Sequence, residues 1–121
     1  MISFRAVSKS YAADHAVRDF TLDMPAGKIT VLMGLSGSGK TTLLRMVNKM
    51  VSPSEGHITI DGVDVREQDS VTLRRSIGYV LQEVGLLPHK SVFENVALIA
   101  RISGQSSAEA SSNAQEMLEL V

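Results

Sequence analysis

The feature that most constrains this chain is a glycine-rich octapeptide at residues 34–41, which reads GLSGSGKT. It fits the phosphate-loop pattern G-x-x-x-x-G-K-[ST], in which glycines let backbone N–H groups approach phosphate oxygens. The apolar run at 29–33 predicts a buried strand before the loop, and residues 41–47 predict a helix after it. The helix start would add unpaired N–H donors and the positive end of the helix dipole. The sequence therefore predicts a loop that holds phosphate groups.

Two side chains at the end of this loop carry further chemistry. Lys40 would bring a mobile cation to the outer phosphates, and the hydroxyl of Thr41 would ligate Mg²⁺. The alternative is a glycine-rich turn that only connects two elements, but the predicted strand and helix on either side favour the phosphate loop. The candidate nucleotide-binding residues of this segment are Gly34, Leu35, Ser36, Gly37, Ser38, Gly39, Lys40, Thr41 and Thr42.

Composition limits the other classes of function. The chain has 121 residues, enough for one small domain. Its net charge of -1 and its aromatic content of 4% give no electrostatic or stacking basis for a nucleic-acid partner. The absence of cysteine excludes disulfides, thiolate metal sites and cysteine nucleophiles. No apolar run approaches the ~20 residues of a membrane span, and the N-terminus lacks the apolar core of a signal peptide, so we expect a cytoplasmic chain.

The remaining pattern predicts an α/β fold. Residues 2–7 and 16–24 alternate as strands do, and residues 57–62 alternate strongly and close on an Asp-Gly turn, which is a hairpin signal. A short helix is predicted at 71–75, and a further apolar strand at 77–81.

Two capping boxes predict helices in the last third of the chain. Ser91 with Glu94 opens a helix through about residue 100, and Ser106 with Glu109 opens a second one. The final residues continue an apolar pattern without a glycine or proline stop signal, so we expect a truncated product or a partial chain. The alternative is a helix that frays at a natural terminus.

Several motifs, in this order and spacing, resemble the N-terminal half of an ABC-transporter ATP-binding subunit. They are KSY at 9–11, the phosphate loop, SEGHITIDG at 54–62, IGYVLQ at 77–82 and LPHKSVFENV at 87–96. The resemblance implies a P-loop NTPase core with an antiparallel β subdomain and the start of a helical subdomain, truncated. Residues 1–121 would form the N-terminal part of one ABC-type ATP-binding domain. About 1–82 would be the nucleotide-binding core and β subdomain, and about 83–121 the start of the helical subdomain.

The resemblance also implies roles for residues outside the loop. Tyr11 matches the aromatic that stacks on adenine, and Val17 matches an apolar contact to the sugar and base. Gln82 matches the glutamine that approaches the metal and the attacking water. Lys40 and Gln82 would thus act in catalysis, and Thr41 and Gln82 at Mg²⁺. Three of these residues also have an ordinary structural interpretation. They could be a half-buried tyrosine at a strand end (Tyr11), a core valine (Val17) and a polar loop glutamine (Gln82).

Details of the motifs are similar to importers of glycine betaine, choline, carnitine and related osmoprotectants. This implies a subunit that couples ATP binding and hydrolysis, with Mg²⁺, to solute import. Its partners would be an integral membrane permease subunit and a second ATP-binding subunit in a nucleotide-sandwich dimer. It would lie at the cytoplasmic face of the cell membrane, held there by the permease.

Three family motifs would lie beyond Val121: the Leu-Ser-Gly-Gly-Gln signature, the strand ending in Asp-Glu, and the switch histidine. None of His15, His57 and His89 matches that histidine. Without a water-activating carboxylate, we expect the 121-residue chain to bind Mg-ATP weakly and to hydrolyse it negligibly. We also expect an exposed apolar sheet edge and poor solubility.

Two other classes of function stay open at this point. The first is a non-catalytic nucleotide-binding half-domain or regulatory fragment. The second is an unrelated phosphate-loop enzyme such as a GTPase, which should carry an Asn-Lys-x-Asp base reader. Residues 48–51 read NKMV and lack that aspartate.

Overall fold

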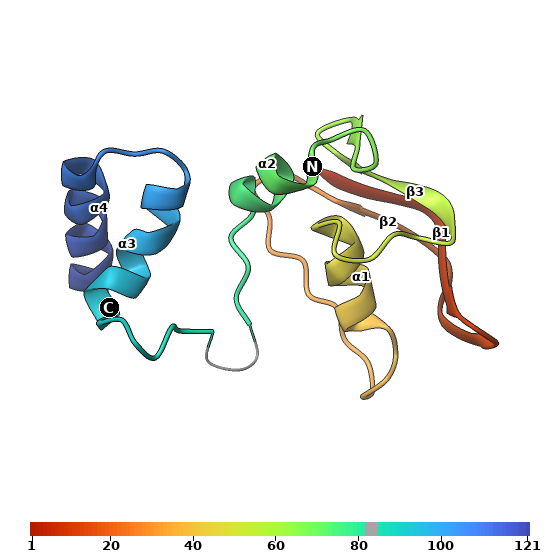
Figure 1. Ribbon diagram of the computed structural model, residues 1–121. Helices are drawn as coiled ribbons and strands as arrows, with labels where there is room; N and C mark the ends of the chain where they lie inside the picture. The colour runs from red at the N-terminus through yellow and green to blue at the C-terminus, as the bar shows by residue number, and fades with distance from the viewer. Residues whose placement is uncertain (82–84) are drawn as a thin grey trace. The chain divides into compact units, whose positions relative to one another are not determined.

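The computed structural model describes residues 1–81 and 85–121, which divide into two compact units, Met1–Ile77 and Gly78–Val121 (Figure 1). The first unit holds the sheet, the glycine-rich loop and the helices α1 (Lys40–Val47) and α2 (Ser70–Ser76). The second unit holds α3 (Val92–Ile102) and α4 (Ser107–Glu119). The predicted α/β class is confirmed. None of the described helices has the length and apolar character that a bilayer-spanning segment needs.

The sheet of the first unit has four antiparallel strands in the order β2-β1-β3-β4. Their bounds are β1 (Ile2–Tyr11), β2 (Asp14–Met24), β3 (Glu55–Ile60) and β4 (Val63–Asp64). The predicted Asp-Gly hairpin is confirmed between β3 and β4, where Asp61 and Gly62 both have positive φ, 50° and 85°. This is the backbone that a tight hairpin turn with the twist of the flanking strands requires.

The hydrophobic core of this unit lies between one face of the sheet and α1 (Figure 1). Phe4 of β1 is fully buried and meets Phe20 of β2 edge to face, with ring centroids 5.2 Å apart and planes at 85°. Helix α1 has one apolar stripe, because its buried residues follow a helical spacing. The buried core consists of Phe4, Val7, Val17, Leu43, Met46, Val47, Ile58, Val65 and Leu73.

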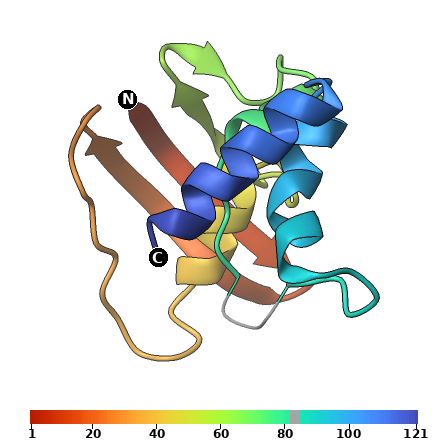
Figure 2. The same cartoon turned by 90° about the vertical axis from the view of Figure 1, so that its left-hand side faces the viewer.

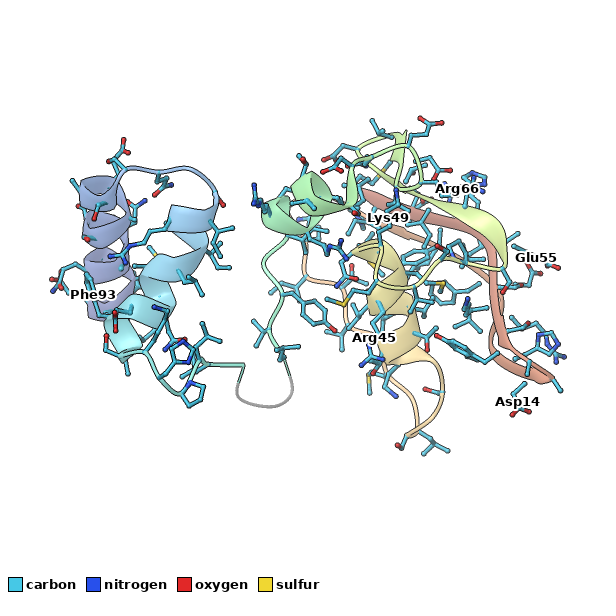
Figure 3. The ribbon with its side chains drawn as sticks, viewed as in Figure 1. Asp14, Arg45, Lys49, Glu55, Arg66 and Phe93 are labelled. Carbon is cyan, nitrogen blue, oxygen red and sulfur yellow. The ribbon has the colours of Figure 1, made fainter. Side chains whose placement is uncertain are left out.

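The turn that follows α1 is held to the segment between β4 and α2 through Lys49, which Figure 3 labels together with Arg66. The Nζ of Lys49 donates hydrogen bonds to the carbonyl oxygens of Arg66, at 2.9 Å, and Gln68, at 2.7 Å. Arg66 in turn holds the carboxylate of Asp64, with Nη2 to Oδ2 at 2.6 Å, and this hydrogen bond lowers the pKa of Asp64. These contacts fix the end of the helix whose start carries the glycine-rich loop.

Two predicted strands are wrong. Residues 29–33 and 77–81 form no strand, and Ile29 and Met33 are 95% and 90% exposed. In Figure 2 the segment at 29–33 lies outside the paired strands of the sheet, although Leu32 packs against the core. An apolar run becomes a strand only when a neighbouring strand accepts and donates its backbone hydrogen bonds. Neither segment has such a neighbour among the described residues.

The second unit is a pair of helices that pack through small side chains. Ala97 of α3 and Ala110 and Ala114 of α4 are buried, which lets the two helix backbones approach closely. Asn95 links the preceding loop to α3 through its side-chain amide. Its Oδ1 accepts a hydrogen bond from the N–H of Leu87, and its Nδ2 donates to the carbonyl oxygens of Leu87 and, at 2.9 Å, Ser91.

Both predicted capping boxes are confirmed, and they make this unit sensitive to acid. Hydrogen bonds from Ser91 lower the pKa of Glu94, and those from Ser106 lower the pKa of Glu109. A carboxyl with a lowered pKa in the folded state stabilises that state above its unfolded pKa, and the contribution is lost as the pH falls through the folded value.

We therefore expect the helix content of α3 and α4 to fall as the pH drops below the ordinary glutamate value of 4.5. Far-ultraviolet circular dichroism between about pH 6 and pH 2 measures this loss. The double variant Glu94→Gln, Glu109→Gln keeps a cap that cannot titrate, so its loss in this range should be smaller. An acid transition identical to that of the unchanged chain would contradict the prediction.

Candidate functional site

The glycine-rich loop at residues 34–41 ends at a helix start that no side chain caps. Gly39 is the N-cap of α1, with a φ of 88° and no side-chain capping hydrogen bond. The first helical bond runs from the N–H of Leu43 to the carbonyl of Gly39, at 2.9 Å. The N–H groups of residues 40–42 therefore have no acceptor within the helix. Unpaired donors together with the positive end of the helix dipole make this turn suitable for an anion.

Gly39 also marks the point where the loop touches β2. A Cβ on this residue would lie 2.3 Å from the carbonyl oxygen of Ala16 and 3.0 Å from Cγ2 of Val17. Only glycine fits this contact, since any side chain would meet the backbone of the neighbouring strand. The position of the loop is thus set against the sheet as well as by α1.

Lys40 closes the loop on itself. Its Nζ donates to the carbonyl oxygens of Gly34, at 2.8 Å, and Leu35, at 2.7 Å, and lies 3.0 Å from Oγ of Ser38. These three contacts use all three donors of the ammonium group. Charge-assisted hydrogen bonds to an anionic oxygen are stronger than those to neutral carbonyls, so a phosphate at the loop would compete well for this side chain.

A cavity of about 390 Å³ lies between β2 and the loop. Four of the predicted site residues, Val17, Gly34, Ser38 and Lys40, are among those that line it. Within the part of the chain that the structure describes, the lining holds cationic side chains and no carboxylate. The other lining residues were not predicted from the sequence and are His15, Ala16, Arg18, Phe20, Leu32, Met33 and Leu43.

Tyr11 lies at the end of β1, opposite Asp14, with 49% of its surface exposed. It is not among the residues that line the cavity. The Nζ of Lys9 lies over its ring, 5.0 Å from the centroid. This contact was not predicted from the sequence, although the spacing of two residues on a strand signals that both side chains lie on the same face.

The remaining predicted site residues lie along the loop and the start of α1, except for Gln82. Leu35, Ser36, Gly37 and Thr41 are exposed along the loop and helix start, and Thr42 is partly buried. Gln82, the predicted metal and water contact, lies outside the described residues. Across residues 1–81 and 85–121, no group of three or more histidine, cysteine or acidic side chains could hold a metal ion.

A phosphate-loop pattern at the start of a helix, beside a sheet that touches the loop, defines the phosphate-loop class of α/β proteins. The family model described as ABC transporter matches residues 17–121, and the chain belongs to this family.

Known relatives agree with this assignment. The chain is 40% identical over 122 residues to the carnitine transport ATP-binding protein OpuCA of Listeria monocytogenes, covering 100% of this chain and 31% of the relative. It is 42% identical over 106 residues to the osmoprotectant import ATP-binding protein OsmV of Salmonella typhimurium, covering 88% and 28%. The chain therefore spans about a third of the length of these relatives.

A solved structure supports the fold. The dimeric post-hydrolysis state of the ATP-binding cassette MJ0796, bound to ADP and Pi, matches with a TM-score of 0.85 and 29% identity. The match covers 98% of this chain and 56% of that one. The two units together thus match just over half of that cassette.

Proposed function

We propose that the glycine-rich loop binds the phosphates of ATP. The observation that carries this proposal is the loop geometry: unpaired N–H groups at the start of α1, with the ammonium of Lys40 on the loop carbonyls. The base would stack on Tyr11, and Val17 would supply an apolar contact beside it. The match to a cassette described as bound to ADP and Pi supports a nucleotide ligand.

Mg²⁺ would enter as part of the nucleotide complex. The described residues offer it the exposed hydroxyl of Thr41 and no acidic cluster, so phosphate oxygens would provide most of its ligands. This fits the usual behaviour of Mg²⁺, which keeps several waters and binds through few protein ligands and substrate phosphates. The metal would neutralise charge on the phosphates. Lys40 would hold the outer phosphates, and Gln82 would contact the metal and the attacking water.

At the level of the whole protein, we propose an ABC-type ATPase that couples ATP binding and hydrolysis to import of an osmoprotectant such as glycine betaine or choline. The names of the relatives support this cargo class. An integral membrane permease and a second ATP-binding subunit would be its partners, at the cytoplasmic face of the membrane. Residues of about 1–82 would form the nucleotide-binding core and β subdomain, and about 83–121 the start of the helical subdomain.

Replacement of Lys40 by alanine tests the nucleotide site. It removes a charge-assisted contact of ~1.5–3 kcal/mol, so Mg-ATP binding should weaken by about 10- to 100-fold. Isothermal titration calorimetry with Mg-ATP measures the affinity of the variant and of the unchanged chain.

The matched control is Lys28→Ala, which removes an exposed lysine of the turn after β2. It should leave the affinity for Mg-ATP unchanged. Equal affinities for all three proteins, or no binding by the unchanged chain, would contradict the proposed function.

A further inference from the structure

Lys9 carries a positive charge that has no role in the nucleotide site proposed above. Its ammonium group lies 5.0 Å from the centroid of the Tyr11 ring, within the ~6 Å at which a cation and an aromatic face attract each other. The side chain is partly buried, and it forms no ion pair with another residue that the structure describes. The ring of Tyr11 is therefore a specific electrostatic partner of this ammonium group.

The sheet register places this pair beside the glycine-rich loop. Lys9 lies opposite Val17 in the β1–β2 ladder, and residues directly opposite each other point to the same face of a sheet. That face is the one covered by α1, because Val17 belongs to the core and nearly touches the Cβ position of Gly39. Tyr11 follows two residues later on the same face, ~7 Å further along the strand.

A nucleotide with its phosphates on the loop and its base on Tyr11 would therefore pass over the pair of Lys9 and Val17. The ring of Tyr11 stands at the exposed end of a strand, and packing restrains it little, since half of its surface is open. A cation on one face of such a ring restricts its motion and leaves the other face for a stacked base.

We propose that Lys9 is a positioning residue for the base platform: its ammonium group occupies one face of the Tyr11 ring and holds the ring ready to stack on adenine. This inference rests on the proposed function. Lys9 thereby contributes to recognition of the base, and the phosphates are held by the loop.

Binding of two probes tests this role. Lys9→Met, which keeps the length of the side chain without its charge, should weaken Mg-ATP binding by about two- to five-fold, which is ~0.5–1 kcal/mol. Binding of inorganic triphosphate with Mg²⁺, which has no base, should not change. Lys9→Arg should restore the affinity for Mg-ATP, because the guanidinium group also stacks on aromatic rings.

The coupling to Tyr11 can be measured in the same assay. In a Tyr11→Ala background, Lys9→Met should have no further effect on Mg-ATP, since the two residues act as one unit. A loss of triphosphate binding as large as that of ATP would mean that Lys9 contacts phosphate directly, and it would overturn the inference.

Fluorescence provides a readout that a merely structural role would not change. The chain has two tyrosines and no tryptophan, so Tyr79→Phe leaves Tyr11 as the single fluorophore. In this background, time-resolved anisotropy should show faster ring motion in Lys9→Met than in the parent, and Lys9→Arg should reverse the change. The matched control Lys28→Met should behave as the parent does.

These measurements can contradict the role of Lys9 without contradicting the proposed function. If the unchanged chain fails to bind Mg-ATP, the proposed function and the inference both fail. If it binds Mg-ATP normally, but Lys9→Met cannot be distinguished from Lys28→Met in affinity and anisotropy, the inference alone is overturned. Circular dichroism of each variant checks that the fold is intact.

Discussion

Replacement of Gly39 by alanine is expected to remove measurable Mg-ATP binding, a larger loss than that from Lys40→Ala. The φ of 88° at this residue lies in the left-handed region, where a side chain costs of order 1–3 kcal/mol. The added Cβ would also lie 2.3 Å from the carbonyl oxygen of Ala16, a backbone atom that cannot rotate away. Either the loop or β2 must therefore move. Because the N–H groups after Gly39 are those proposed to hold phosphate, this movement disrupts the binding site itself.

The control Gly62→Ala separates the effect of the steric clash from the energetic cost of a side chain at positive φ. Gly62 has a similar φ of 85°, but a Cβ there would meet no heavy atom within 4 Å. Its variant should lose some stability and keep its affinity for Mg-ATP. Calorimetric titration and urea unfolding of both variants measure the two effects. Binding by Gly39→Ala at the level of Gly62→Ala would show that the clash does not govern the site.

The elements that sequence predicted well are those whose chemistry is local. The loop at 34–41, the Asp-Gly hairpin and the capping boxes of Ser91 and Ser106 each depend on residues within a few positions of one another. Their backbone geometry follows from glycine conformation or from side-chain caps. No distant partner is needed, so the pattern alone is sufficient.

The strands predicted at 29–33 and 77–81 are wrong because a strand, unlike a turn or a cap, depends on residues far away in the sequence. Their apolar residues do match buried strands, but a strand is completed by the hydrogen bonds of a neighbour. The described residues supply no neighbour, so hydrophobicity alone could not decide the structure of these segments. The solved cassette is nearly twice as long as the matched region, which is consistent with this explanation.

The candidate site also combines local structure, which the sequence predicts, with contacts between distant residues, which it does not. Its loop was predictable, but the contact that the loop makes with β2 depends on where that strand lies in the sheet. A Cβ on Gly39 would lie 2.3 Å from the carbonyl oxygen of Ala16 of β2, in a strand whose register with β1 is irregular. Three non-glycine residues with positive φ, Ala6, Ala12 and Asp19, accompany that register, and neither alanine carries a recognisable turn signal.

The second large effect is expected from Met46→Ala, which should lower the free energy of unfolding of the first unit by about 2–5 kcal/mol. Met46 is fully buried in the core between α1 and the sheet, so its truncation leaves a cavity. Urea unfolding followed by Tyr11 fluorescence, in a Tyr79→Phe background, reports on this unit. The matched control is Met50→Ala, because Met50 is 52% exposed and its truncation should cost less than about 0.5 kcal/mol. Equal losses in the two variants would contradict the core assignment.

Unfolding of Met46→Ala in the presence of Mg-ATP also separates the stability of α1 from the binding chemistry of the loop. A ligand that binds only the native state adds a stabilisation that depends on its concentration and its dissociation constant. Because Met46 belongs to the buried core and not to the loop, the added stabilisation should equal that of the unchanged chain at the same Mg-ATP concentration. Lys40→Ala should show the reverse behaviour, with little change in stability without ligand and a smaller gain with it. A reduced gain in Met46→Ala would mean that the packing of α1 also sets the geometry of its first turn.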